Sequence, residues 1–190
     1  MLSLALQEST EDIHKQAEKK MIRELKQIQS PSNYARLLNW MYGFYQPMED
    51  KIGAWLTENV FPDMEKRRRA ANILRDIQAI GQTLPYPDIC RDLPRIDSFA
   101  EALGAMYVLE GSTLGGRVIA NMLSRQLGGT DGLSFFNAYG METGSMWLSF
   151  KSFLDRPFRE EERRQILAAA KDTFLKFKNW IDQHELHAQL

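Results

Sequence analysis

Residues 99–127 read FAEALGAMYVLEGSTLGGRVIANMLSRQL, a stretch that is apolar on nearly every side of a helical wheel. A helix with no polar face for solvent belongs in the centre of a core. Ser98 precedes the stretch as an N-cap, with Glu101 at capping-box spacing, and the pair Gly128–Gly129 follows its end. The pattern therefore predicts one buried helix over the whole stretch.

The rest of the chain has a helical pattern nearly throughout. We expect a first helix from Leu2 that ends before Ser30, further helices over 31–58, 61–80, 140–154 and 159–186, and an irregular proline-bearing loop at 82–97. Pro47 lies inside the second helix, where it removes a backbone donor, so we expect a kink or a break there. The sequence has no strand-like alternation and no internal repeat. It predicts one all-α domain over residues 1–190, a single multi-helix bundle.

Composition narrows the class of protein. The chain has 24 Lys and Arg against 25 Asp and Glu, a net charge of -1, which argues against nucleic acid or an acidic membrane surface as the main partner. Cys90 is the only cysteine, so an internal disulfide and a cysteine-rich metal site are excluded. No apolar stretch of about 18 residues predicts a membrane span. Together with the absence of a recognisable signal peptide, these features predict a cytoplasmic protein.

One histidine stands apart from the other two. His184 and His187 lie in a polar C-terminal tail, whereas His14 falls on the apolar stripe of the first helix and is expected to point inward. Glu18 follows one turn later and can reach a ring nitrogen of His14. Spacing alone favours an ordinary core histidine with a helical ion pair. It leaves open a single axial ligand to heme iron, whose other ring nitrogen would bond Glu18.

Three glycines interrupt the central apolar stretch. Gly111, Gly115 and Gly116 each cost about 1 kcal/mol relative to alanine inside a helix. Glycine can offset this loss of helix stability in two ways. It lets another helix pack closely, or it lets a flat ligand approach bare backbone and permits a bend. Both explanations stand equally from the residues alone. Surplus aromatic residues suit either a ligand slot or an ordinary core: Tyr107, Trp147, Phe174 and Phe177.

Two of these segments resemble motifs of the heme oxygenase family, most closely its bacterial branch. Residues 7–18, QESTEDIHKQAE, resemble the family's proximal helix, and residues 102–116, ALGAMYVLEGSTLGG, resemble its distal helix. Weaker likenesses cover residues 147–154 and 174–177. The resemblance implies a helical bundle that holds heme as both cofactor and substrate. It also implies oxidation of heme to biliverdin, CO and free iron with O2 and electrons from a redox protein or other reductant.

The resemblance also implies roles for individual residues. His14 becomes the axial ligand of the iron, and Glu18 hydrogen-bonds it from outside the first coordination shell. Gly111, Gly115 and Gly116 become the distal backbone over the iron, where the helix kinks. Tyr107, Phe174 and Phe177 are the expected aromatic lining.

The chain departs from the animal-type pattern at two positions. Ser112 stands where those enzymes carry an aspartate that orders distal water, so Ser112, Thr113 or backbone carbonyls are the candidates for supplying a proton. Gln7 stands where they carry a lysine near a heme propionate. The propionate partners are therefore expected elsewhere, with Arg117, Lys151 and Lys178 as candidates.

Three other functions remain open. A related helical bundle without heme is expected to place acidic and cysteine residues around a cavity, whereas Cys90 lies in the proline-bearing loop. A non-catalytic heme carrier or sensor would bind heme without turnover. A purely structural interaction module would not bind heme at all.

Overall fold

The computed structural model describes residues 1–83 and 87–184, and this part of the chain is helical with no strand. The helices are α1 (Leu2–Lys26), α2 (Pro31–Gly53), η1 (Met64–Lys66), α3 (Ala71–Ala79), α4 (Phe99–Gly111), α5 (Gly116–Leu127), η2 (Gly140–Glu142), α6 (Thr143–Leu154) and α7 (Glu160–Gln183). The all-α bundle that the sequence predicts is confirmed. The last two residues expected for the final helix, and His187, lie outside the described residues.

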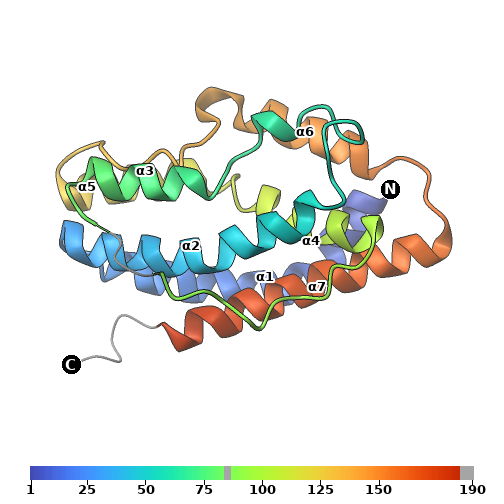
Figure 1. Cartoon of the computed structure of the whole chain (residues 1–190), viewed down its shortest axis with the longest axis horizontal. Coiled ribbons are helices and arrows are strands. Elements are labelled where there is room, and N and C mark those ends of the chain that lie inside the picture. Colours follow the sequence, from blue (N-terminus) through green and yellow to red (C-terminus); the bar gives the residue numbers. More distant parts are fainter. Residues whose placement is uncertain (84–86, 185–190) are drawn as a thin grey trace.

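The longest helices form the body of the molecule. α1, α2 and α7 run along its longest axis, and α3, α5 and α6 lie on one side of them (Figure 1). α7 packs extensively against both α1 and α4. Gly104 makes the α4–α7 contact possible, because a Cβ at this position would overlap the carbonyl oxygen of Ile166. One continuous hydrophobic core joins all of these helices.

α2 continues through Pro47, so the expected break is absent. Ser30 caps the helix by accepting a hydrogen bond from the Asn33 N–H, and Pro31 occupies its first turn. Pro47 has no N–H with which to satisfy the carbonyl of Gly43 four residues earlier. That carbonyl instead accepts from the Cys90 N–H at 2.9 Å. The proline-bearing loop thus supplies the hydrogen bond that the helix lacks.

The prediction of a helix over 61–80 is wrong for the first half of that range. The structure has the short η1, an extended residue at Arg67, and only then α3. Arg67 and Arg68 are 3% and 8% exposed. The helix is interrupted by the extended backbone at Arg67. Both arginine side chains point into the interior, where Glu110 and the Leu109 carbonyl of α4 accept their hydrogen bonds.

The helix expected over 99–127 is divided in two. The N-cap is confirmed, since Ser98 Oγ accepts from the Glu101 N–H at 3.2 Å. α4 ends at Gly111, residues 112–115 form a turn, and α5 begins at Gly116. We call residues 112–115 the central turn. The glycines therefore end one helix and begin another, instead of being tolerated inside a continuous one.

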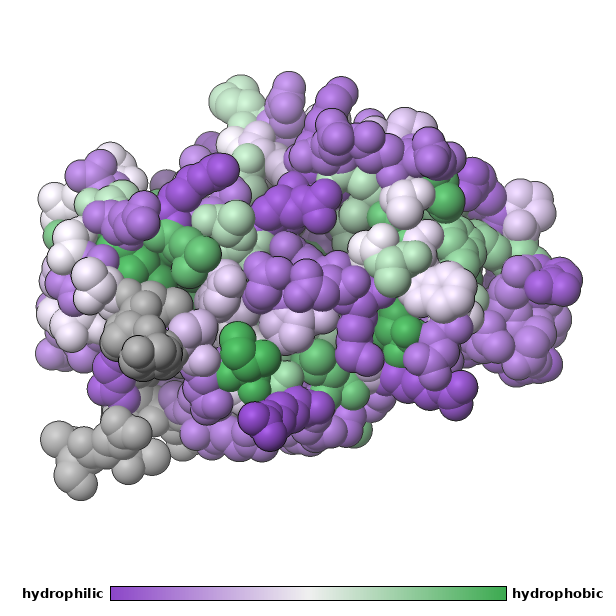
Figure 2. Space-filling model, viewed as in Figure 1, coloured by the Kyte–Doolittle hydropathy of each residue, from purple (hydrophilic) through white to green (hydrophobic). Residues whose placement is uncertain are grey.

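The surface is mixed in character. Figure 2 shows one face, on which hydrophilic residues predominate and apolar residues form small separate groups. Among the described helices, none combines the length and the hydropathy that crossing a membrane requires.

Candidate functional site

His14 occupies an unusual place on α1. Thr10 and Ala17, the neighbours that share its stripe, are only 2% and 3% exposed, yet His14 itself is exposed. The expectation that the ring would be buried is therefore wrong. The stripe does run along the buried face of α1, but the His14 side chain within it is accessible. This accessible ring in a buried stripe is what a ligand that enters from outside would need.

The imidazole of His14 does have one aromatic neighbour. The ring of Phe174 on α7 lies 5.2 Å from it, centroid to centroid. Glu18 is exposed, and within the described residues no hydrogen bond joins it to His14. The proposed orientation of His14 by Glu18 stays a prediction.

A chain of contacts runs from α1 to the end of α4. Thr10, whose hydroxyl donates to the Leu6 carbonyl, lies near the Tyr107 hydroxyl and lowers its pKa, and the Tyr107 ring lies 5.7 Å from that of Trp147 on α6. Trp147 in turn covers Gly111, where a Cβ would come within 3.8 Å of the indole. Burial raises the pKa of Tyr107 and outweighs the opposite effect of Thr10, so this side chain is a neutral phenol.

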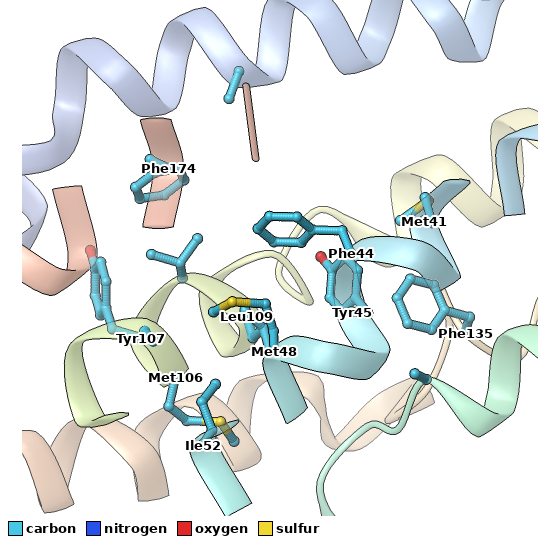
Figure 3. Packing of buried hydrophobic residues seen from close by; sticks show 14 of the residues in the cluster. Met41, Phe44, Tyr45, Met48, Ile52, Met106, Tyr107, Leu109, Phe135 and Phe174 are labelled. Atoms are coloured by element: carbon cyan, nitrogen blue, oxygen red, sulfur yellow. The ribbon is translucent and has the colours of Figure 1, made fainter. Parts of the chain in front are cut away.

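A second chain of contacts reaches the central turn from α7. Phe177 is half-buried, and its ring lies 5.0 Å from Phe44 and 6.2 Å from Tyr45. The Tyr45 hydroxyl is 3.1 Å from Ser112 Oγ. Figure 3 shows Phe174, Tyr107, Phe44 and Tyr45 gathered in the same part of the core. Of the predicted aromatic residues, Phe174 thus contacts His14, while Tyr107 and Phe177 belong to the contacts that reach the end of α4 and the central turn.

The three glycines have different surroundings. Gly115 has no neighbour within 4 Å of the position of a Cβ, so its backbone borders open space. A Cβ at Gly116 would instead overlap the carbonyl oxygen of Phe136. Close packing therefore accounts for Gly116, and bare accessible backbone is found at Gly115. Close packing, the first explanation that the sequence left open, holds at Gly116, whereas the approach of a flat ligand to Gly115 stays a prediction.

The candidate propionate partners are dispersed. Arg117 is exposed in the first turn of α5. Lys178 is half-buried on α7, with Nζ 4.0 Å from Asp182 Oδ2. Lys151 is half-buried on α6, where it acts electrostatically on Asp155. Their roles stay predictions.

Sequence reasoning missed a buried polar network behind α4. Arg67 Nη1 donates to Glu110 Oε2 at 2.6 Å, and both side chains are at most 3% exposed. Tyr139 donates to Glu110 Oε1 at 2.9 Å and accepts from the Arg68 N–H at 2.7 Å. One signal was available: Glu110 is a charged residue in an apolar part of the helix, and a buried carboxylate requires a cationic partner.

A small pocket lies beside this network. Its lining combines carboxyl, guanidinium and apolar groups, from Tyr45, Glu49, Ile52, Met64, Arg68, Arg69, Met106, Leu109 and Glu110. Burial raises the pKa of Glu49 to about 7, although the Ala70 N–H donates to the carboxylate and Arg69 and Arg68 oppose the shift. His14 is not part of this pocket.

The residues fit a heme better than a bare metal ion. No group of three or more His, Cys, Asp or Glu side chains that could hold a metal ion occurs among residues 1–83 and 87–184. Heme needs only one axial imidazole from the protein and an apolar surface for its ring. Fold and site together define an all-helical bundle in which an accessible imidazole packs on Phe174 and other aromatic side chains lead to a glycine-rich turn.

The chain belongs to the heme oxygenase family, whose model, described as "Heme oxygenase", matches residues 1–183. The chain is 32% identical over 146 residues to a heme oxygenase of Xanthomonas campestris, an alignment that covers 76% of this chain and 86% of the relative. It is 27% identical over 186 residues to heme oxygenase PigA of Pseudomonas aeruginosa, with 92% and 88% covered. The family expected from the two motifs is confirmed.

Solved structures confirm the fold. A heme oxygenase from Neisseria meningitidis superposes with a TM-score of 0.81 at 18% identity, covering 100% of this chain and 95% of the other. The enzyme from Leptospira interrogans gives 0.75 at 23% identity, with 96% and 98% covered. Heme oxygenase-1 from Synechocystis, solved in complex with heme, gives 0.66 at 16% identity, with 96% and 91% covered.

Proposed function

We propose that the chain is a heme-degrading monooxygenase that cleaves heme to biliverdin, CO and free iron, using O2 and electrons from a reductant. Its family and relatives support this activity. The structural observation that carries the proposal is the exposed His14 ring within the otherwise buried stripe of α1. Heme is the substrate, and its iron supplies the means of activating O2.

His14 is the proposed axial ligand. A neutral imidazole donates less electron density to iron than a thiolate does, and so promotes O–O cleavage less. That property suits a reaction in which the porphyrin ring is the group to be oxidised. Glu18, one turn along α1, would accept the N–H of the other ring nitrogen once the imidazole is fixed by the iron.

The remaining groups would hold the macrocycle. Tyr107, Phe174 and Phe177 offer apolar surface for the flat ring. Gly111, which Trp147 covers, and Gly115 would lie on the distal side, where the open backbone of Gly115 leaves room above the ring. Arg117 and Lys178 are the proposed partners of the propionates, with Lys151 as a further candidate.

We also propose a redox protein or a small reductant as the electron source, and the cytoplasm as the location. The near balance of charge and the mixed surface support an interaction that uses neither nucleic acid nor a membrane (Figure 2).

A single-turnover assay tests the activity. Purified protein is loaded with hemin and given ascorbate in air, with catalase present to remove free peroxide. We expect loss of the Soret band, a broad red absorbance from biliverdin, and CO trapped by deoxymyoglobin. Stable heme binding without CO release would contradict the proposed enzyme activity and indicate a heme carrier. Failure to bind hemin would overturn both.

A further inference from the structure

Arg68 is a buried arginine directed at the central turn. Its Nη2 donates to the carbonyl of Leu109 and to Ser112 Oγ, both at 2.6 Å. Its guanidinium lies over the rings of Tyr45, at 5.0 Å, and Phe135, at 4.4 Å. Its side chain is therefore fixed from two sides and bonded at its tip to the last turn of α4.

Ser112 makes several of the hydrogen bonds that fix the central turn. Besides the bond from Arg68, its hydroxyl donates to the Leu109 carbonyl at 2.7 Å and lies 3.1 Å from the Tyr45 hydroxyl. A serine hydroxyl offers one donor and two acceptor sites. All three are used here, although Ser112 is otherwise exposed. These three hydrogen bonds hold the Ser112 hydroxyl in place at the turn.

The arrangement matters because Gly111 and Gly115 flank Ser112 closely. Neither glycine has a side chain to anchor it, and Gly115 borders open space. The order of the turn must come from its neighbours. Thr113 contributes a local bond to the Glu110 carbonyl at 2.7 Å, while Arg68 is the charged group that ties Ser112 to another element.

We propose that Arg68 is the positioning residue of the central turn: acting through Ser112, it fixes where the bare backbone of Gly111 and Gly115 lies. The inference rests on the proposed function, in which that backbone faces the heme. Arg68 does not touch the heme itself. Its loss is expected to affect the chemical step much more than hemin binding, because the iron ligand lies on α1. A misplacement of about 1 Å can lower a rate about a hundredfold.

The test begins with the ligand-free chain. Hydrogen exchange is followed by mass spectrometry in Arg68→Met, Ser112→Ala and the matched control Arg69→Met. Arg69 lines the same pocket but donates to the Met64 carbonyl, away from the turn. We expect faster exchange over residues 110–118 in the first two variants, at least about tenfold since a charge-assisted bond is lost, and wild-type exchange in the control.

The same variants are then loaded with hemin. For Arg68→Met we expect a hemin Kd within about threefold of wild type and single-turnover CO release at least tenfold slower, with partial recovery in Arg68→Lys. Wild-type exchange at the turn, or a rate equal to the control, would overturn the proposal while leaving the enzyme assignment intact. Should Arg68→Met unfold, Ser112→Ala decides by the same criteria. Wild-type protein that fails to bind hemin would instead contradict the proposed function.

Discussion

Glu49 shows how one residue can make stability depend on pH. Its carboxyl group is partly buried in the pocket that also holds Arg68, Arg69 and Glu110. Burial disfavours the ionised form and raises the pKa to about 7, against a usual value of 4.5. The folded state therefore binds a proton more tightly than the unfolded chain does. The contribution of Glu49 to stability is fully present below the unfolded pKa and is lost as pH rises through the folded one.

Glu49→Gln should remove this dependence. The amide oxygen can still accept from the Ala70 N–H, while the penalty for a buried charge disappears. We expect the variant to be more stable than wild type above pH 7, by at most about 3 kcal/mol, and the difference to shrink toward pH 4.5. Urea unfolding at several pH values measures it. A wild-type advantage at pH 8 would contradict this account of the carboxyl group.

Ser112 and Glu18 show what could not be predicted for single residues from the sequence. The sequence placed both near the heme, and neither role is tested by the fold. Ser112 has all its hydrogen-bonding capacity occupied by Arg68, Tyr45 and Leu109. No spacing along the chain could have predicted this, because Arg68 comes from a segment that the pattern places inside a continuous helix over 61–80.

At the scale of elements, the two consecutive glycines of the α4–α5 junction perform different tasks. Gly116 allows α5 to pack against the carbonyl of Phe136, and Gly115 stands beside open space. Hydrophobic pattern predicted the apolar stretch and its N-cap, but it predicted one helix where there are two. Burial also changes at the break: α4 is buried nearly throughout, whereas α5 buries only Gly116, Ala120 and Leu123, so the expectation of a buried helix over the whole stretch is wrong for its second half.

Gly116→Ala and Gly115→Ala form a matched pair. The added methyl group at 116 meets backbone, which cannot move aside as a side chain can, so we expect a loss of about 3 kcal/mol or more in the free energy of unfolding. The same methyl group at 115 meets nothing, and stability should stay within about 0.5 kcal/mol of wild type. Chemical denaturation compares them, and equal losses would show that the packing at Gly116 has been misjudged.

At the scale of the whole molecule, the Arg67–Glu110 pair joins segments distant in sequence. Arg67 also donates to the Met146 carbonyl on α6, and Tyr139 bonds Glu110 from the loop before α6. The all-α bundle and its family could be predicted from the helical pattern and two motifs. This network could not, since it depends on which charged residues the tertiary fold buries together.

Glu110→Gln should destabilise the entire bundle. It leaves the buried guanidinium of Arg67 with only the partly exposed Asp63, at 3.4 Å, as a counter-ion, and breaking a buried pair costs about 3–5 kcal/mol. Asp97→Asn disrupts the exposed pair with Arg95 and should leave stability near the wild-type value. Thermal unfolding of both variants makes the comparison. Equal behaviour would mean that the buried pair does not hold the segments together.

The hemin spectrum of His14→Ala tests the central claim most directly. His184→Ala is the matched control, since His184 packs on Trp180 and bonds Asp88 at the end of α7. If His14 is the axial ligand, the wild type and the control give a sharp Soret band, His14→Ala gives a weakened or shifted one, and added imidazole restores it. A Soret band in His14→Ala identical to that of wild type would contradict the assignment of His14.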